Sequence, residues 1–123
     1  MIRFLEGADF IKNKEGLTSL LTKYKIVFET LDTFDSDFSE GLVNNSPEDL
    51  DMTLKKATGY FTTLISIMGA FEAYKTNKGG IKALSEDERT VYELVKAYID
   101  KADKMIIVCQ TLRKNNTKEW IRQ

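Results

Sequence analysis

The chain has 123 residues, of which 42% are hydrophobic and 30% are charged, with 18 basic and 19 acidic side chains. It contains seven glycines, one proline, one cysteine and no histidine. This composition excludes collagen-like, disulfide-stapled and low-complexity chains, and the length fits one domain with a single core. The absence of histidine excludes the commonest general bases and nearly all zinc sites. We therefore expect a protein that is not an enzyme, with no catalytic residues, no metal and no cofactor.

The N-terminal part is expected to be a short arm followed by a helix. The arm covers residues 1–14, and its pattern fits either a short strand or a helical turn packed on the rest. Its early acidic residues and lack of a continuous apolar run do not fit a signal peptide. Apolar residues then recur at three- and four-residue steps, which predicts a helix over 16–38. Ser39, Glu40 and Gly41 mark its end.

Two further helices carry clear start signals. Ser46 is a candidate N-cap, Pro47 suits the first helical position, and Asp49 three residues after the serine completes a capping-box variant. This predicts a helix over 47–77, ended by Gly79 and Gly80. A second capping box, Ser85 to Glu88, predicts a helix over 86–115, with a possible tail turn at 117–122. No strand-period segment is found. We expect one all-α domain, a three-helix antiparallel bundle built on a long helical hairpin.

The second helix is apolar on more than one side. Between Ala57 and Phe71 no residue is charged, and a helix without a charged face is usually buried all round. One interpretation is self-association into a homo-oligomer or ring through a seam of small residues and its flanks. The other is a central helix covered by the first helix, the third helix and the arm. The candidate oligomer-interface residues are Gly59, Tyr60, Thr63, Ser66, Ile67, Ala70 and Ala73.

Charge is unevenly distributed along the chain. Residues 1–49 carry five basic and ten acidic side chains, whereas residues 50–123 carry thirteen basic and nine acidic. The basic clusters fit a surface that binds phosphates, with aromatic residues able to stack on bases. They also fit ordinary solvated helix ends, where the helix dipole favours cations. The candidate nucleic-acid-binding residues are Tyr74, Lys75, Lys78, Lys82, Arg113, Lys114, Lys118, Trp120 and Arg122.

The remaining candidate residues, the acidic cluster and the cysteine, are expected to have structural roles. Asp32, Asp35, Asp37 and Glu40 lack the glycine and the distal glutamate of a calcium loop, so we expect a solvated acidic face. Cys109 lies on an apolar helix face and is expected to be a buried structural cysteine. A single cysteine is typical of a reducing cytosol, and the longest uncharged run is too short and polar to span a membrane. We expect a soluble cytoplasmic protein.

Residues 49–116 resemble one known family. The pattern includes Asp49-Leu50, Phe71-Glu72-Ala73-Tyr74, Tyr98-Ile99-Asp100 and Leu112-Arg113. It resembles the small recombination-mediator proteins of phages, of the UvsY-like kind. The resemblance implies a helical protein that assembles into rings, binds single-stranded DNA and helps a recombinase to displace single-strand binding protein. No functional residue is carried over from that family.

The sequence therefore leads to two functional hypotheses. The first is a non-enzymatic, oligomeric, phage-type accessory protein that binds single-stranded DNA and mediates recombinase loading, with a recombinase or a single-strand binding protein as partner. The alternative is a small helical inhibitor or adaptor, such as a phage counter-defence protein, that docks a host protein without nucleic acid. In the second hypothesis the apolar residues outside the main helix faces form the docking surface.

Overall fold

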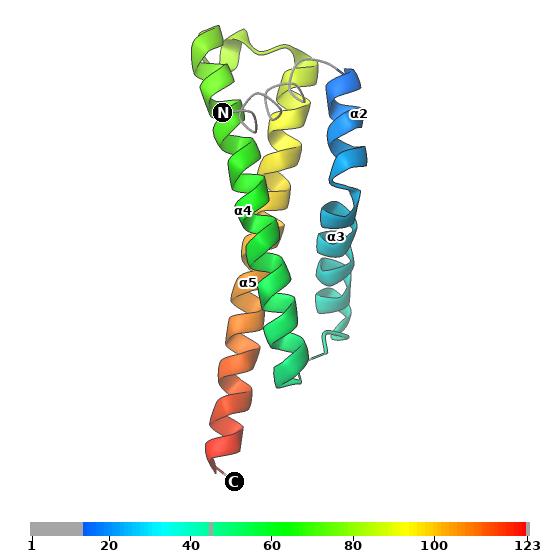
Figure 1. Ribbon diagram of the computed structural model, residues 1–123, viewed down its shortest axis with the longest axis vertical. Coiled ribbons are helices and arrows are strands. Elements are labelled where there is room, and N and C mark those ends of the chain that lie inside the picture. Colours follow the sequence, from blue (N-terminus) through cyan, green and yellow to red (C-terminus); the bar gives the residue numbers. More distant parts are fainter. Residues whose placement is uncertain (1–13, 45, 123) are drawn as a thin grey trace.

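The computed structural model describes residues 14–44 and 46–122, with side chains described for 18–44 and 46–115. The predicted arm thus lies outside the described residues, except for its last residue. The described part is helical and contains no strand, which confirms the all-α prediction (Figure 1). Its elements are α2 (Lys14–Lys23), α3 (Lys25–Glu40), α4 (Pro47–Lys78), the 3-10 turn η1 (Ile81–Ala83) and α5 (Glu86–Arg122).

Helices α4 and α5 form the predicted long hairpin and contain most of the core. On α4, Leu50, Ala57, Leu64 and Phe71 recur every seven residues and are at most 1% exposed. This spacing keeps them on one side of the helix, facing α5. The α5 side of the core consists of Val91, Val95, Ala102, Met105 and Cys109. Burial of these side chains holds the two long helices together.

Helix α3 packs on α5 and runs parallel to it (Figure 1). Lys101 of α5 lies 2.7 Å from Asp32, and Lys104 lies 2.6 Å from Asp35. The rings of Phe28 and Tyr98 pack with their centroids 4.5 Å apart. The contact of α3 with α4 is slight within the described residues. The acidic residues expected to be a solvated face therefore include two that pair with lysines of α5.

The predicted first helix is interrupted. Instead of one helix over 16–38, the structure has α2 and α3 on either side of Tyr24, which has φ −107° and ψ 25°. The backbone hydrogen bonds from Tyr24 to Leu20 (3.0 Å) and from Phe28 to Tyr24 (3.1 Å) persist across the break. Both segments stay in contact with α5 on either side of the break. Apolar periodicity does not reveal it because the three- and four-residue steps continue through Tyr24.

The ends of the hairpin helices differ in part from expectation. Helix α4 begins at Pro47 as predicted, with the Ser46 side chain accepting a hydrogen bond from the Asp49 backbone N–H at 3.4 Å. It ends at Lys78, one residue later than predicted, and is capped by Gly79, whose φ of 114° suits glycine. Helix α5 runs without a break to Arg122, so the expected tail turn at 117–122 is instead the last part of this helix (Figure 1).

Candidate functional site

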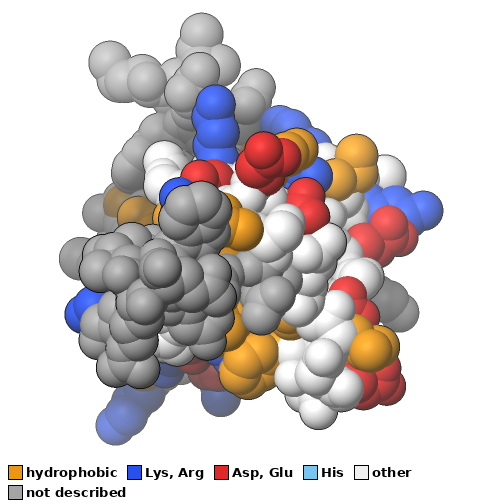
Figure 2. Space-filling view, turned by 90° about the horizontal axis from the view of Figure 1, so that it is seen from below, with side chains coloured by type: hydrophobic (Ala, Val, Ile, Leu, Met, Phe, Trp, Pro, Cys, Tyr) orange, Lys and Arg blue, Asp and Glu red, His pale blue; other side chains and the backbone are white. Residues whose placement is uncertain are grey.

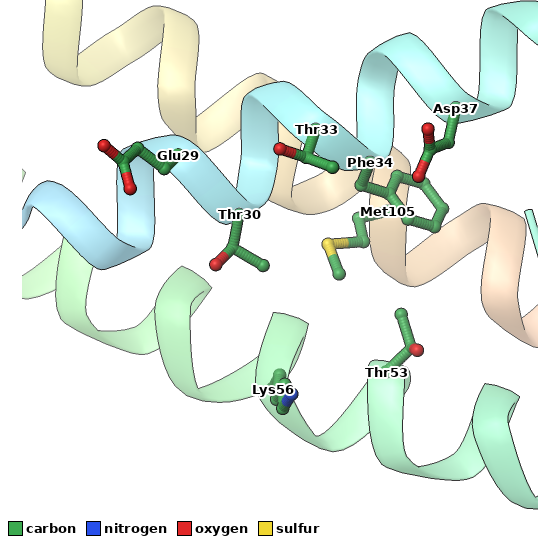
Figure 3. A pocket seen from close by; sticks show the side chains of 8 residues that line it. All are labelled: Glu29, Thr30, Thr33, Phe34, Asp37, Thr53, Lys56 and Met105. Atoms are coloured by element: carbon green, nitrogen blue, oxygen red, sulfur yellow. The ribbon is translucent and has the colours of Figure 1, made fainter.

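A groove lies between α3 and α4, where these two helices diverge over α5 (Figure 3). Its volume is about 410 Å³. Phe34 and Met105, both buried, form its floor, and Thr30 and Thr53 project into it from opposite sides. We call this cavity the α3–α4 groove. It is lined by Glu29, Thr30, Thr33, Phe34, Asp37, Thr53, Lys56 and Met105.

The two rims of the groove have opposite charge. The α3 rim carries Glu29 and Asp37, and the α4 rim carries Lys56. Glu29 lies 3.8 Å from Lys25 on its own helix, and both side chains are more than half exposed. Among the described residues, neither Asp37 nor Lys56 forms an ion pair. A ligand bound in the groove would therefore contact an acidic side formed by α3 and a basic side formed by α4.

The most exposed large apolar side chains lie on elements that border this groove. Ile26 is 72% exposed, and it precedes Thr30, Thr33 and Asp37 by steps that place it on the same face of α3. Met52 is 60% exposed and lies four residues before Lys56, on the same face of α4. Leu42, 65% exposed, follows α3 in the loop that leads to α4. Apolar surface thus extends the groove at both ends.

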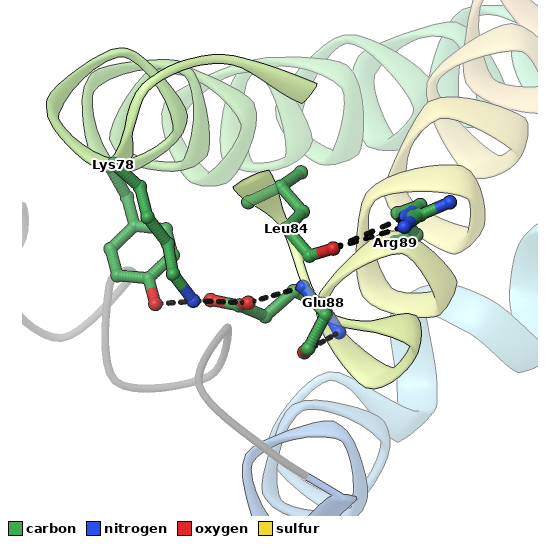
Figure 4. A network of polar contacts seen from close by, with 6 residues as sticks. Lys78, Leu84, Glu88 and Arg89 are labelled. Atoms are coloured by element: carbon green, nitrogen blue, oxygen red, sulfur yellow. Dashed lines mark hydrogen bonds and ion pairs between the residues drawn. The ribbon is translucent and has the colours of Figure 1, made fainter. Parts of the chain in front are cut away.

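A second polar cluster lies where α4 and α5 meet, around Glu88 (Figure 4). The Glu88 carboxylate is only 1% exposed. Lys78 Nζ donates to Glu88 Oε1 at 2.6 Å, the Ser85 backbone N–H donates to the same oxygen at 2.7 Å, and the Tyr74 hydroxyl donates to Oε2. The Glu88 N–H in turn donates to the Ser85 hydroxyl at 3.2 Å, completing the predicted capping box. We call this cluster the Glu88 clamp.

The clamp has a strong electrostatic signature. Burial of the carboxyl raises its pKa, but the hydrogen bonds from Lys78, Tyr74 and Ser85 outweigh burial and lower the pKa of Glu88 to about 2. The hydrogen bond to Glu88 raises the pKa of the Tyr74 hydroxyl and that of the Lys78 ammonium. Every partner thus stabilises the ionised carboxylate. The clamp ties the last turn of α4 to the first turn of α5, and we interpret it as a structural element.

Several of the predicted nucleic-acid-binding residues are part of such intramolecular contacts. Tyr74 and Lys78 belong to the Glu88 clamp, and Lys75 lies 2.7 Å from Glu72. Arg113 donates to Asp51 at 3.0 Å near the other end of the hairpin. Lys82 and Lys114 are exposed. The side chains of the last three, Lys118, Trp120 and Arg122, lie outside the described residues.

The predicted basic residues do not converge on one surface. Lys75 and Lys78 lie at one end of α4, whereas Arg113 lies far along α5, roughly 40 Å from the start of that helix at 1.5 Å per residue. The lysines of the connection also have acidic neighbours, because Glu86, Asp87 and Glu88 open α5. Figure 2, viewed along the bundle, shows acidic, basic and hydrophobic side chains interspersed.

The predicted oligomer-interface residues divide into buried and accessible positions. Ile67 and Ala70 are 4% and 1% exposed, so they belong to the core of the chain itself. Tyr60, Thr63 and Ala73 are half-buried, and Gly59 and Ser66 are exposed. The seam is therefore not one continuous free face. Its accessible members continue the spacing of Met52 and Lys56 along α4, beside the groove that the sequence did not reveal.

Three other kinds of feature bear on function within the described ranges: a reactive cysteine, a metal site and a membrane-spanning helix. Cys109 is buried, as expected for a structural cysteine, and burial raises the pKa of its thiol. In these ranges no three His, Cys, Asp or Glu side chains gather in a way that suits a metal ion. No helix there has the length and apolarity that are needed to cross a bilayer.

The fold and the site together define the structural class of this protein. It is a helical hairpin with a third helical segment on one side and an open groove between α3 and α4. Comparison with known proteins finds no matching family model, no matching curated protein and no matching solved structure. The resemblance to UvsY-like recombination mediators therefore stays a prediction from the sequence, and the function is argued from the chain's own residues.

Proposed function

We propose that this protein is a non-enzymatic docking module that holds an amphipathic helix of another polypeptide in the α3–α4 groove. The observation that supports this proposal most directly is the groove itself. Its apolar floor of Phe34 and Met105 lies between two helices, α3 and α4, that make little contact with each other. An amphipathic helix placed in a groove of this kind is a recurrent form of protein recognition. This proposal shares protein docking with the alternative hypothesis drawn from the sequence, but it places the docking surface at the groove instead of on the apolar residues outside the main helix faces.

The charges of the rims define the occupant. Acidic Glu29 and Asp37 on α3 favour basic residues on the facing side of the bound helix. Lys56 on α4 favours acidic residues on its other side. The apolar floor, extended by Ile26 and Met52, favours an apolar stripe between them. The expected ligand is therefore a helix with one apolar stripe, a basic flank and an acidic flank.

A designed peptide tests this proposal. An 18-residue fluorescent peptide with leucines at helical spacing, lysines along one flank and glutamates along the other is titrated with the protein at micromolar concentrations. We expect saturable binding with a dissociation constant on the order of 10 µM, comparable to other modest helix-in-groove contacts. Thr33→Arg places a long side chain in the groove and should weaken binding at least tenfold, by about 1.4 kcal/mol.

The matched control is Thr111→Arg, the same substitution at an exposed helical threonine. Thr111 lies six residues after Met105, about 240° around α5 and thus away from the groove floor. Its variant should bind the peptide like the unchanged protein. Equal weakening by both substitutions, or no saturable binding at protein concentrations at which the chain is monomeric, contradicts the proposed function.

Single-stranded DNA binding stays a separate prediction. It requires anisotropy of labelled oligo-dT that rises with protein and falls steeply with salt. Lys82→Glu and Lys114→Glu are suitable variants because both lysines are exposed and lie outside the Glu88 clamp. Loss of binding in these variants would favour the mediator hypothesis. A flat titration at low salt would leave protein docking as the function.

A further inference from the structure

We infer that the polypeptide bound at the α3–α4 groove is a second copy of this chain, packed about a two-fold axis that runs parallel to the helices. The inference rests on the proposed docking function and names its partner, in which the basic flank is supplied by α4 and the acidic flank by α3 instead of both by one helix. In this arrangement α3 of each copy packs on α4 of the other, and the two grooves face each other. The interface is therefore the same patch on both copies, as two-fold symmetry requires.

Two rows of accessible residues border the groove. Steps of four and three residues keep the members of each row on one face of its helix. The α3 strip consists of Ile26, Thr30, Thr33 and Asp37, and the α4 strip consists of Met52, Lys56, Gly59, Thr63 and Ser66. All nine residues are exposed or half-buried in the single chain.

The α4 strip can be covered without losing hydrogen bonds. The Thr63 hydroxyl donates to the Gly59 carbonyl at 3.1 Å, and the Ser66 hydroxyl donates to the Thr62 carbonyl at 3.1 Å. Both hydroxyl donors are thus satisfied within the helix. Beside Gly59 there is open space, since apart from its chain neighbours and the adjacent backbone of its own helix no atom lies within 4 Å of where a Cβ would be. A second helix can therefore approach the backbone closely at this point.

Charge complementarity selects the direction of the two-fold axis. The Lys104–Asp35 and Arg113–Asp51 pairs fix the register of α3 and α4 against α5. In this register Asp37 lies level with the stretch of α4 that begins at Lys56. An axis parallel to the helices therefore places Asp37 of each copy opposite Lys56 of the other. An axis across the helices would place acidic rim against acidic rim, which is unfavourable.

The same arrangement covers the most exposed large apolar residue of α3. By the register above, Ile26 lies level with the upper end of the α4 strip, next to Ser66. The partner's α4 offers small residues there, which leave room for the isoleucine. Ile26 is 72% exposed in the single chain, so its burial is a favourable contribution of the interface.

A charge exchange tests the inference, with mass measured by light scattering over a range of protein concentrations. The unchanged chain of 14.1 kDa is expected to form a dimer of about 28 kDa. Asp37→Lys and Lys56→Asp should each raise the dimer dissociation constant roughly 10- to 100-fold, because each creates two like-charge contacts. The double variant, which exchanges the charges, should restore the dimer. Asp100→Lys, an exposed reversal about 220° around α5 from Met105, is the matched control and should stay dimeric.

The outcomes separate this inference from the function on which it rests. Helicity measured by circular dichroism verifies that each variant is folded, and the double variant makes the result independent of any single destabilising change. A chain that is monomeric at all concentrations but binds the designed peptide overturns the inference and leaves the docking function intact. Single reversals that remain dimeric, a double variant that does not recover, or a larger assembly indifferent to these charges also overturn it.

Discussion

Replacing Glu88 with alanine is expected to lower the free energy of unfolding by about 3 kcal/mol. The carboxylate is 1% exposed and accepts hydrogen bonds from Tyr74, Lys78 and the Ser85 backbone N–H. Its removal leaves the Tyr74 hydroxyl and the Ser85 N–H without their acceptor. It also removes the polar contacts that connect the end of α4 to the start of α5. In a domain of this size the loss corresponds to a melting temperature lower by roughly 12 °C.

Glu86→Ala is the matched control for this measurement. Glu86 is an exposed glutamate in the same first turn of α5, where its contribution is the interaction with the helix dipole. Its replacement should lower the free energy of unfolding by about 0.5 kcal/mol, measured by urea denaturation alongside Glu88→Ala. Equal effects of the two substitutions would show that the Glu88 clamp does not stabilise the hairpin.

Acid is expected to destabilise the protein through the same residue. The pKa of Glu88 is about 2 in the folded chain, lowered from its ordinary value of 4.5. Because the folded pKa is the lower one, the stabilisation is fully present above pH 4.5 and is lost as the pH falls towards 2. A shift of this size corresponds to about 3 kcal/mol, and screening by water around the partly exposed Lys78 reduces the expected loss to about 2 kcal/mol.

The pH dependence is measured by urea denaturation between pH 7 and pH 2, for the unchanged chain and for Glu88→Gln. Glutamine keeps the shape of the side chain but does not titrate. The variant should therefore be less stable at neutral pH and should lose less stability on acidification. Parallel stability curves for the two proteins would contradict the assignment of this titration to Glu88.

The sequence predicts well those parts of the fold that depend on neighbouring residues. The caps at Ser46 and Ser85 follow from residues three positions apart, and both form as predicted. The core of α4 follows from the seven-residue recurrence of Leu50 to Phe71. These signals are local, because a helix places residues three, four and seven positions apart on one face.

The site is less predictable because it depends on how the helices are placed. Nothing in the spacing of apolar residues indicates that α3 packs on α5 and diverges from α4, which is what creates the groove. The interruption at Tyr24 is equally hidden in a continuous periodic pattern. The mixed polar and apolar residues that line the groove are recognisable as a group only after the helices are positioned.

The Glu88 clamp shows a related difficulty. The capping box explains by a local interaction alone why a glutamate follows Ser85 by three residues. Tyr74 and Lys78 lie 14 and 10 residues away, across a turn, so that their convergence on Glu88 depends on the hairpin closing. The lysines predicted to bind phosphate are for this reason partly engaged in holding the hairpin together.

The most direct test of the central claim, that the face formed by α3 and α4 is a docking surface for a second copy, is amide hydrogen exchange at low and high protein concentration. Segments 26–37 and 52–66 should exchange more slowly as the concentration rises through the dimer dissociation constant, because the interface covers them. The outer face of α5 around Ile107, which is 52% exposed, should be unaffected. Protection that does not change with concentration, or that appears around Ile107 instead, would contradict the account.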